Sequence, residues 1–375
     1  MNKLNLIFFT YFLMWIPNTQ GQNLSSSLQS ILEKNYPDKT GPGAVIYVLE
    51  GQKVSTASTG LASLKLKENN GIHMPFRMAS VSKQFTAFAI YQLTNNQKLN
   101  LNQRIDYYFP TLNKNVGAIT IKQLLNHSSG IADYEGLMGD KWTVQLTDAD
   151  VLKIIEPATE TYFPIGSKFR YSNTAYCLLA LIVERVSKQS YPSYMQQHVF
   201  EPLGMKNSLI MSKERVPNPR AFGYHPEKGK FIFADQSLTS GTMGDGGVYT
   251  TASDYAIWLG YLSKLLSNQT TQEFYFGTEN RFPINQNVAY SFGWFIGKDK
   301  AGEDILFHSG ESTGFHNIVV FYPSKGKSVS MFSNRDDLLI VDVFDEVMDV
   351  LDIEIEGLEK EKLFHWLGKV YANTF

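Results

Sequence analysis

The chain has 375 residues, of which 43% are hydrophobic and 13% aromatic, and its formal net charge is −2. This length and composition predict a globular protein with enough core for two packed lobes. The near-neutral charge gives no electrostatic basis for binding nucleic acid or an anionic membrane surface. Small neutral or mildly charged ligands fit the composition better.

The first 21 residues have the pattern of a secretory signal peptide. Lys3 precedes a short apolar run over residues 4–16, and small and polar residues follow up to Gly21. The run is too short for a comfortable transmembrane helix, so we expect cleavage after Gly21, with an uncleaved anchor as the alternative. The mature protein would then be periplasmic or secreted, with no membrane span. The single cysteine, Cys177, lies in an apolar run, which favours a buried structural thiol.

The first elements of the mature chain predict a helix and the start of a sheet. Apolar residues at helical spacing indicate a helix over residues 24–36, which Pro37 ends. Two strand-like runs, residues 43–50 and 53–60, form a predicted hairpin. From residue 84 to residue 265 long segments with helical periodicity dominate, and we expect a helical lobe there.

Ser80 and Lys83 lie three residues apart at the head of a strongly apolar run. On a helix the two side chains share one face, so the lysine amine could remove the proton of the serine hydroxyl. The helix N-terminus and burial both favour a neutral lysine. The alternative is a capping serine beside a snorkelling lysine. The same spacing at Ser324 and Lys327 follows a proline and contains a glycine, which indicates a turn.

Residues 120–130 carry signals for the start and the end of a helix. Thr120 is placed as an N-terminal cap with Gln123 three residues later, and Gly130 closes the segment. His127 falls in the expected last turn. Because a helix C-terminus favours a histidine there, we expect a structural rather than a catalytic role for it.

A polar triplet that begins with Tyr171 and ends with Asn173 directly precedes a helix that is apolar nearly all round. The triplet is therefore expected at the entrance of a buried helix. The Tyr-x-Asn pattern recurs at Tyr371 and Asn373 in the C-terminal tail, so the bare pattern is not specific. Position in the chain favours the first occurrence.

The last third of the chain predicts a return to strands. Residues 240–254 form a glycine-rich loop that runs into a helix, with Thr251 and Asp254 spaced as a capping box. The loop lacks Gly-Lys-Ser/Thr, so close backbone approach explains its glycines better than phosphate binding. Two helices, residues 338–351 and 360–371, finish the chain. The expected hairpin-linked antiparallel strands cover residues 289–296, 304–310, 317–322 and 328–333.

Taken together, these patterns resemble the serine beta-lactamase and penicillin-binding superfamily. The resemblance is to its class C beta-lactamase-like branch, with the related D-Ala-D-Ala carboxypeptidases, D-amino-acid peptidases and esterases, and it covers about residues 24–351. Three short motifs in the family's order and spacing make one specific signal. The matching positions are Ser80 and Lys83 for Ser-x-x-Lys, Tyr171 and Asn173 for Tyr-x-Asn, and His308, Ser309 and Gly310 for the third motif.

The resemblance implies an α+β fold of the beta-lactamase/DD-peptidase type. An antiparallel sheet would be flanked by N- and C-terminal helices, with an all-helical lobe inserted between its two parts. The expected divisions are a signal peptide (1–21), a hydrolase domain (22–352) and a short C-terminal helical extension (353–375). The sheet lobe would comprise about residues 22–75 and 285–352, and the helical lobe about residues 76–284.

The resemblance also implies roles for the motif residues. Ser80 would attack a carbonyl carbon and form an acyl-enzyme, while Lys83, hydrogen-bonded to Tyr171, manages the proton. Tyr171 would pass a proton to the leaving group and activate the deacylating water, helped if Lys83 and His308 depress its pKa. The backbone N–H groups of Ser80 and Glu311 would form the oxyanion hole. The implied substrate-binding and oxyanion positions are Asn173, His308, Ser309, Gly310 and Glu311.

The third motif bears on the substrate. With His308 in place of a lysine, binding of a beta-lactam or peptide carboxylate should be weaker. We therefore expect hydrolysis of a small ester, amide or D-configured peptide. The alternatives are a class C-like beta-lactamase or a penicillin-binding D,D-carboxypeptidase. A catalytically silent binding or scaffold protein with this fold is the alternative of another class. The seven histidines are scattered, so we expect no metal and no cofactor.

Overall fold

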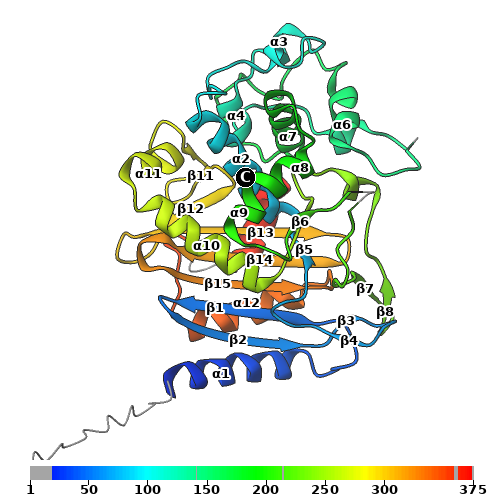
Figure 1. Ribbon diagram of the computed structural model, residues 1–375, viewed down its shortest axis with the longest axis vertical. Helices are drawn as coiled ribbons and strands as arrows, with labels where there is room; N and C mark the ends of the chain where they lie inside the picture. Colours follow the sequence, from blue (N-terminus) through cyan, green and yellow to red (C-terminus); the bar gives the residue numbers. More distant parts are fainter. Residues whose placement is uncertain (1–18, 141, 213–214, 359–361, 374–375) are drawn as a thin grey trace, which may run out of the picture.

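The computed structural model describes residues 19–140, 142–212, 215–358 and 362–373. An antiparallel sheet at its centre combines the N-terminal hairpin with strands from the last third of the chain, which confirms the expected fold class (Figure 1). In spatial order its strands are β10 (Phe282–Pro283), β11 (Ala289–Ser291), β12 (Trp294–Lys298), β13 (Asp304–Ser312), β14 (Phe315–Tyr322), β15 (Lys327–Ser333), β1 (Ala44–Glu50) and β2 (Lys53–Thr59).

Helices from the two ends of the chain cover one face of this sheet. They are amphipathic, with apolar residues at helical spacing such as Ile340, Phe344 and Val347, and they share one buried cluster with the sheet. The helices predicted over residues 24–36 and 338–351 are thus confirmed, with ends that differ by a few residues. These helices are α1 (Thr19–Asn35), α12 (Leu339–Val350) and α13 (Leu363–Tyr371).

The opposite face of the sheet joins a second buried cluster, which continues into a helical lobe (Figure 1). The long apolar helix α7 packs against α2, α4, α6 and α8 within this lobe, and α10 packs on β1 and β15. These and the remaining helices are α2 (Lys83–Asn95), α3 (Lys114–Gly117), α4 (Ile121–Leu125), α5 (Tyr134–Leu137), α6 (Asp148–Ile155), α7 (Asn173–Ser187), α8 (Tyr191–Met195), α9 (Glu201–Leu203), α10 (Ala252–Leu266) and α11 (Gln269–Phe276).

Short strands lie outside the main sheet, several of them in the span where the sequence predicted helices alone. They have two to four residues each, too few to show an alternating pattern, and this is why periodicity missed those between residues 84 and 265. They pair as β3 (Leu61–Ser63) with β4 (Glu68–Asn69), as β7 (Tyr224–Glu227) with β8 (Lys230–Phe233), and as β5 (Phe76–Arg77) and β6 (Leu209–Ile210) with β9 (Val248–Thr250).

Two further predictions on local structure were wrong in extent. The strand expected over residues 289–296 is two strands, because Phe292 and Gly293 both have positive φ and turn the chain between β11 and β12. The capping box of Thr120 and Gln123 is present, but α4 ends after five residues. His127 therefore lies beyond the helix, in the left-handed region.

Most of the predicted signal peptide, residues 1–18, lies outside the described residues. Residues 19–21 form the first turn of α1. Within the described ranges, no helix combines the length and the apolar character that crossing a membrane requires.

Candidate active site

Ser80 lies in a 3₁₀ turn, Ala79–Ser82, between β5 and α2. The preceding residue, Ala79, has φ of +48°, a left-handed conformation that costs a residue other than glycine about 1–3 kcal/mol. The turn is held in place because Ser82 Oγ accepts the Val248 N–H at 3.0 Å. Strained backbone that is fixed by its surroundings is common at functional sites.

Lys83 begins α2 and is fully buried. Its Nζ lies 3.0 Å from Ser80 Oγ, 2.8 Å from Asn173 Oδ1 and 3.0 Å from the backbone oxygen of Asp245. A neutral amine has two N–H donors and one lone pair. The two carbonyl oxygens can take both donors, which leaves the lone pair directed at the serine hydroxyl.

Burial lowers the pKa of Lys83 to about 8, although the neighbouring Asp245, Cys177 and Glu135 act to raise it. The expectation that burial favours a neutral lysine is confirmed. At pH 7 roughly a tenth of the molecules would carry a neutral amine at this position.

Tyr171 directly precedes Ser172, whose side chain caps α7 by accepting the Ala175 N–H. The Tyr171 hydroxyl is buried and makes no hydrogen bond of 3.5 Å or less among the described residues, although the Ser80 hydroxyl is near enough to act on its pKa. Lys83 Nζ lies 4.9 Å from the Tyr171 ring centroid. The expected hydrogen bond from Lys83 to Tyr171 is therefore wrong, because Asn173 and Asp245 take the amine's donors.

The condition that would help Tyr171 act as a base, a pKa depressed by Lys83 and His308, is not met. Burial raises the pKa of the Tyr171 hydroxyl well above its usual value, and nearby Tyr371 raises it further. Tyr171 is thus a neutral phenol, which can donate a proton but is a weak base. Behind it, the ring centroid of His127 lies 4.4 Å from that of Tyr171, and His127 Nδ1 accepts the Ser172 N–H. This contact fits the structural role expected for His127.

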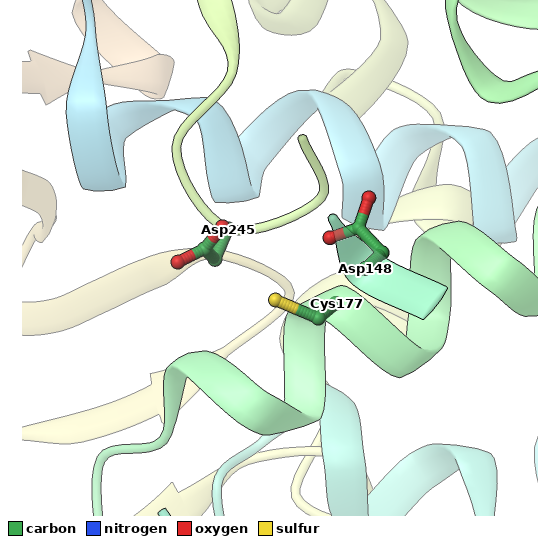
Figure 2. Close-up of side chains that lie close together, drawn as sticks. All are labelled: Asp148, Cys177 and Asp245. Carbon is green, nitrogen blue, oxygen red and sulfur yellow. The ribbon is translucent and has the colours of Figure 1, made fainter. Parts of the chain in front are cut away.

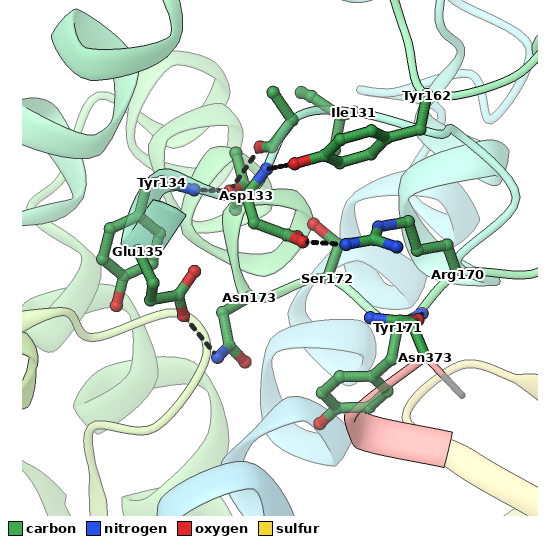
Figure 3. Close-up of polar contacts among 12 residues, drawn as sticks. Ile131, Asp133, Tyr134, Glu135, Tyr162, Arg170, Tyr171, Ser172, Asn173 and Asn373 are labelled. Carbon is green, nitrogen blue, oxygen red and sulfur yellow. Dashed lines mark hydrogen bonds and ion pairs between the residues drawn. The ribbon is translucent and has the colours of Figure 1, made fainter. Parts of the chain in front are cut away.

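Asn173 connects Lys83 to an acidic side chain that the sequence did not single out. Its Oδ1 accepts from Lys83, and its Nδ2 donates to Glu135 Oε1 at 2.7 Å (Figure 3). Glu135 follows Tyr134 in α5 and belongs to none of the three motifs. The pair fixes the orientation of the Asn173 amide.

Strand β13 brings the third motif beside Ser80. A Cβ at Gly310 would stand 2.1 Å from the Met78 oxygen and 3.3 Å from the Ser80 nitrogen, so only glycine allows this approach. Asn317 on β14 donates to the Arg77 oxygen at 2.9 Å and holds the turn against the sheet. The backbone around Gly310 and Glu311 therefore lies beside the Ser80 N–H.

His308 is fully buried, and both of its ring nitrogens are engaged within the protein. Nδ1 lies 2.6 Å from the Ser309 oxygen and Nε2 lies 3.3 Å from the Tyr290 hydroxyl. Burial, and then the charge of Lys83, lower the pKa of His308 to about 3. The imidazole is therefore neutral at physiological pH and offers no positive charge to a substrate carboxylate.

Behind Lys83, three buried side chains form an acid cluster, defined here as Asp148, Cys177 and Asp245 (Figure 2). One potential ligand atom from each lies within 4.8 Å of the others. Asp148 accepts the backbone N–H groups of Met243 and Gly244, and burial raises its pKa to about 8. A carboxyl group that is mostly protonated is a poor cation ligand, so the cluster fits a structural role. Cys177 is buried, as predicted.

Two residues of the C-terminal tail also lie at this site, although the sequence gave their Tyr-x-Asn pattern no weight. The Tyr371 hydroxyl contacts Ser309, and Asn373 Oδ1 accepts the Tyr171 N–H at 3.0 Å (Figure 3). Both contacts join residues more than 60 positions apart, which local pattern reasoning cannot detect.

Comparisons with known proteins agree with this geometry. The family model described as Beta-lactamase matches residues 31–343. Penicillin-binding protein 4* of Bacillus subtilis (strain 168) is 26% identical over 336 residues, which cover 84% of this chain and 73% of that protein. Protein flp of Staphylococcus aureus (strain MW2) is 25% identical, and the match spans 85% of this chain but only 64% of the relative.

Solved structures give the same result. A penicillin-binding protein from Bacillus halodurans is 28% identical, with a TM-score of 0.74 over 86% of this chain and 98% of that one. A D-amino acid amidase from Ochrobactrum anthropi SV3, 23% identical, also has a TM-score of 0.74, over 88% of this chain and 98% of its own. The second likeness bears on the fold alone.

Proposed function

The chain belongs to the beta-lactamase family and is a serine hydrolase, and on that premise we propose that Ser80 forms an acyl-enzyme with a small ester, amide or D-configured peptide. The observation that carries the proposal is the 3.0 Å contact between Lys83 Nζ and Ser80 Oγ. A general base within 2.6–3.2 Å of the proton it removes has the required reach. Burial supplies the neutral amine.

Acylation follows from these contacts. Lys83 takes the proton of Ser80 as Oγ attacks the substrate carbonyl carbon. The oxyanion that forms would accept hydrogen bonds from the backbone N–H groups of Ser80 and Glu311. The close approach of β13, where a Cβ at Gly310 would stand 3.3 Å from the Ser80 nitrogen, supports this assignment. Losing one such donor usually costs about 3–4 kcal/mol of transition-state stabilisation.

Tyr171 fits the role of acid in the second half of acylation. Its raised pKa keeps the phenol protonated, so it can donate its proton to the leaving atom as the bond to the carbonyl carbon breaks. Return of that proton from the Lys83 ammonium to the phenol requires the two groups to approach each other, since no hydrogen bond joins them in this structure. In deacylation the neutral Lys83 amine activates the water that attacks the acyl carbon, and Ser80 recovers its proton.

The neutral state of His308 supports substrates without an essential carboxylate near the third motif. Esters and small amides meet that condition better than penicillins. The similarity to a penicillin-binding protein of known structure keeps penicillin recognition as the second candidate.

We place the protein outside the cytoplasm, from the signal-like sequence of residues 1–21. Mass spectrometry of the protein in separated cytoplasmic and extracytoplasmic fractions of its native host would test this. An N-terminus at Gln22 supports export with cleavage, an intact Met1 outside the cytoplasm supports the uncleaved anchor, and an intact Met1 found only in the cytoplasm contradicts export.

The experiment that tests the nucleophile uses a fluorophosphonate probe and, separately, a fluorescent penicillin. The wild type, Ser80→Ala and Ser324→Ala are compared, the last being a matched control because Ser324 begins the other Ser-x-x-Lys pattern. We expect labelling at Ser80, located by peptide mapping, in the wild type and the control only. Absence of any adduct in folded wild type would contradict the proposal, and preference for penicillin would favour the second candidate.

A further inference from the structure

The C-terminal helix ends inside the candidate active site. α13 packs on the sheet through buried Leu363, Trp366, Leu367 and Val370, and the Trp366 ring meets Phe295 edge-on with centroids 5.6 Å apart. This packing fixes the direction of the helix. Its last residue, Tyr371, consequently lies against β13 rather than in solvent.

The Tyr371 hydroxyl occupies the hydrogen-bonding groups of one β13 residue. It lies 3.3 Å from the Ser309 nitrogen, 3.4 Å from the Ser309 backbone oxygen and 2.8 Å from Ser309 Oγ. It also lies 3.4 Å from His308 Nδ1. Burial raises the pKa of this hydroxyl, so it remains a neutral phenol that accepts and donates hydrogen bonds rather than removing protons.

Ser309 lies at an edge of β13 that has no neighbouring strand among the described residues. β12 pairs with β13 only as far as Phe307, so the edge beyond that residue has no strand partner in the described part of the chain. In an antiparallel strand the N–H and C=O of one residue point to the same side, and those of the residue two further along do so too. The backbone groups of Ser309 and Glu311 therefore face the same free edge.

A free edge of this kind is where an extended peptide would add as a further strand. At Ser309 the edge is occupied by Tyr371, whereas the backbone of the next residue, Gly310, lies beside the Ser80 nitrogen. The C-terminal tail also contacts the second motif. The rings of Tyr371 and Tyr171 have centroids 4.6 Å apart, and Asn373 accepts the Tyr171 N–H. The tail is thus fastened to two of the three motifs.

We propose that Tyr371 is a specificity-determining residue that closes the β13 edge at Ser309 and restricts the enzyme to short substrates unable to pair along that strand. The inference rests on the proposed function, since it assigns the substrate class to the Ser80 site. Peptide-like substrates with an amide or carboxylate on both sides of the scissile carbonyl would compete with Tyr371 for Ser309. Simple acyl esters would not.

The test compares two substrates in full-length protein: p-nitrophenyl acetate, which is short, and hippuryl thioglycolate, which carries an amide on one side and a carboxylate on the other. The readout is the ratio of their kcat/KM values. Tyr371→Ala opens the edge, Tyr371→Phe removes only the hydroxyl, and His365→Ala is a control at an exposed position of the same helix. Melting temperature and fluorophosphonate labelling of Ser80 are measured for each.

We expect Tyr371→Ala to raise the ratio in favour of the extended substrate by about tenfold or more. Tyr371→Phe should raise it by about threefold, the effect of freeing one hydrogen-bonding position. The His365 control should not change it. An unchanged ratio in Tyr371→Ala with full Ser80 labelling, or a parallel fall for both substrates, would overturn the proposal.

Two outcomes separate this proposal from its premise. If the wild type neither labels nor hydrolyses either substrate, the proposed function fails, and this is seen before any variant is made. If Tyr371→Ala does not fold, Tyr371→Phe decides the matter, because it keeps the ring that packs on Tyr171. A ratio that stays at the wild-type value in Tyr371→Phe then counts against the proposal.

Discussion

Lys83 and Asp148 lie in two neighbouring regions and show how burial acts on opposite charges. Both are fully or almost fully buried, and both contact the glycine-rich loop that contains Gly244 and Asp245. Burial lowers the pKa of the lysine to about 8 and raises that of the aspartate to about 8. Each group is thereby pushed toward its neutral form.

The difference between the two regions is what the neutral group faces. The Lys83 amine contacts the hydroxyl of a partly exposed serine, whereas Asp148 contacts backbone N–H groups and buried Cys177. A perturbed pKa identifies a catalytic group only where a reacting atom is within reach. We therefore expect changes at Lys83 to alter chemistry, and changes at Asp148 to alter stability.

The largest effect is expected for Lys83→Met, which keeps the length of the side chain and removes the base. The value of kcat/KM for p-nitrophenyl acetate should fall by about 10³-fold or more, because a general base contributes about 10²–10⁴-fold. Stability should hold or rise, since a buried amine is replaced by an apolar group. A variant with more than a tenth of wild-type activity would show that Lys83 is not the catalytic base.

The next effect concerns the close approach of β13 to the turn that contains Ser80. Gly310→Ala places a Cβ 2.1 Å from the Met78 oxygen, so strand and turn must separate. We expect a loss of about 2–4 kcal/mol in the free energy of unfolding and a large loss of labelling at Ser80. Gly368→Ala is the matched control, because a Cβ there meets nothing within 4 Å. Equal melting temperatures for the two variants would show that the approach is not tight.

The pH dependence of the rate sharpens the comparison further. Since the base form of Lys83 is the neutral amine and its pKa is lowered to about 8, kcat/KM should rise about tenfold per pH unit below that value and level off above it. Asp245, Cys177 and Glu135 face the amine and oppose the shift. Stopped-flow rates between pH 5.5 and about 9.5 would test this. A profile that is flat through this range would exclude Lys83 as the titrating base.

The smallest effect on activity is expected for Asp148→Asn. The folded pKa of Asp148 is raised above its unfolded value, so its contribution to stability is present below about pH 4 and is lost as pH rises toward about 8. Asparagine does not titrate. The variant should gain on the wild type by about 1.4 kcal/mol per pH unit across that interval, with kcat/KM changed by less than about threefold. Urea unfolding at pH 5 and pH 8 measures the free energy of unfolding of both proteins. A variant that gains no stability relative to the wild type between these two pH values would contradict the expectation.

Local sequence patterns predicted the parts of the site that are set by neighbours in the chain. The spacing of Ser80 and Lys83 works because residues three apart share a face even in the short turn that precedes α2. The cap before α7 places Tyr171 for a similar reason. The family resemblance added the order of the three motifs.

Patterns failed where tertiary contacts decide. The Tyr371 and Asn373 pattern was set aside because it lies in the tail, yet the packing of α13 returns the tail to the site. The raised pKa of Tyr171 depends on burial by rings from distant segments. The turn at Phe292 was hidden by an apolar run that suits one strand as well as two.

The arrangement of the sheet also determines when the enzyme becomes active during its synthesis. β1 pairs with β15 across about 280 positions of sequence, and the site draws on segments near residues 80, 171, 308 and 371. A ribosome must therefore release nearly all of this sequence before β1 can pair with β15 and Tyr371 can dock against Ser309. Such non-local pairing makes folding slow. The nascent chain consequently carries Ser80, the proposed nucleophile, for most of translation without the other residues of the site.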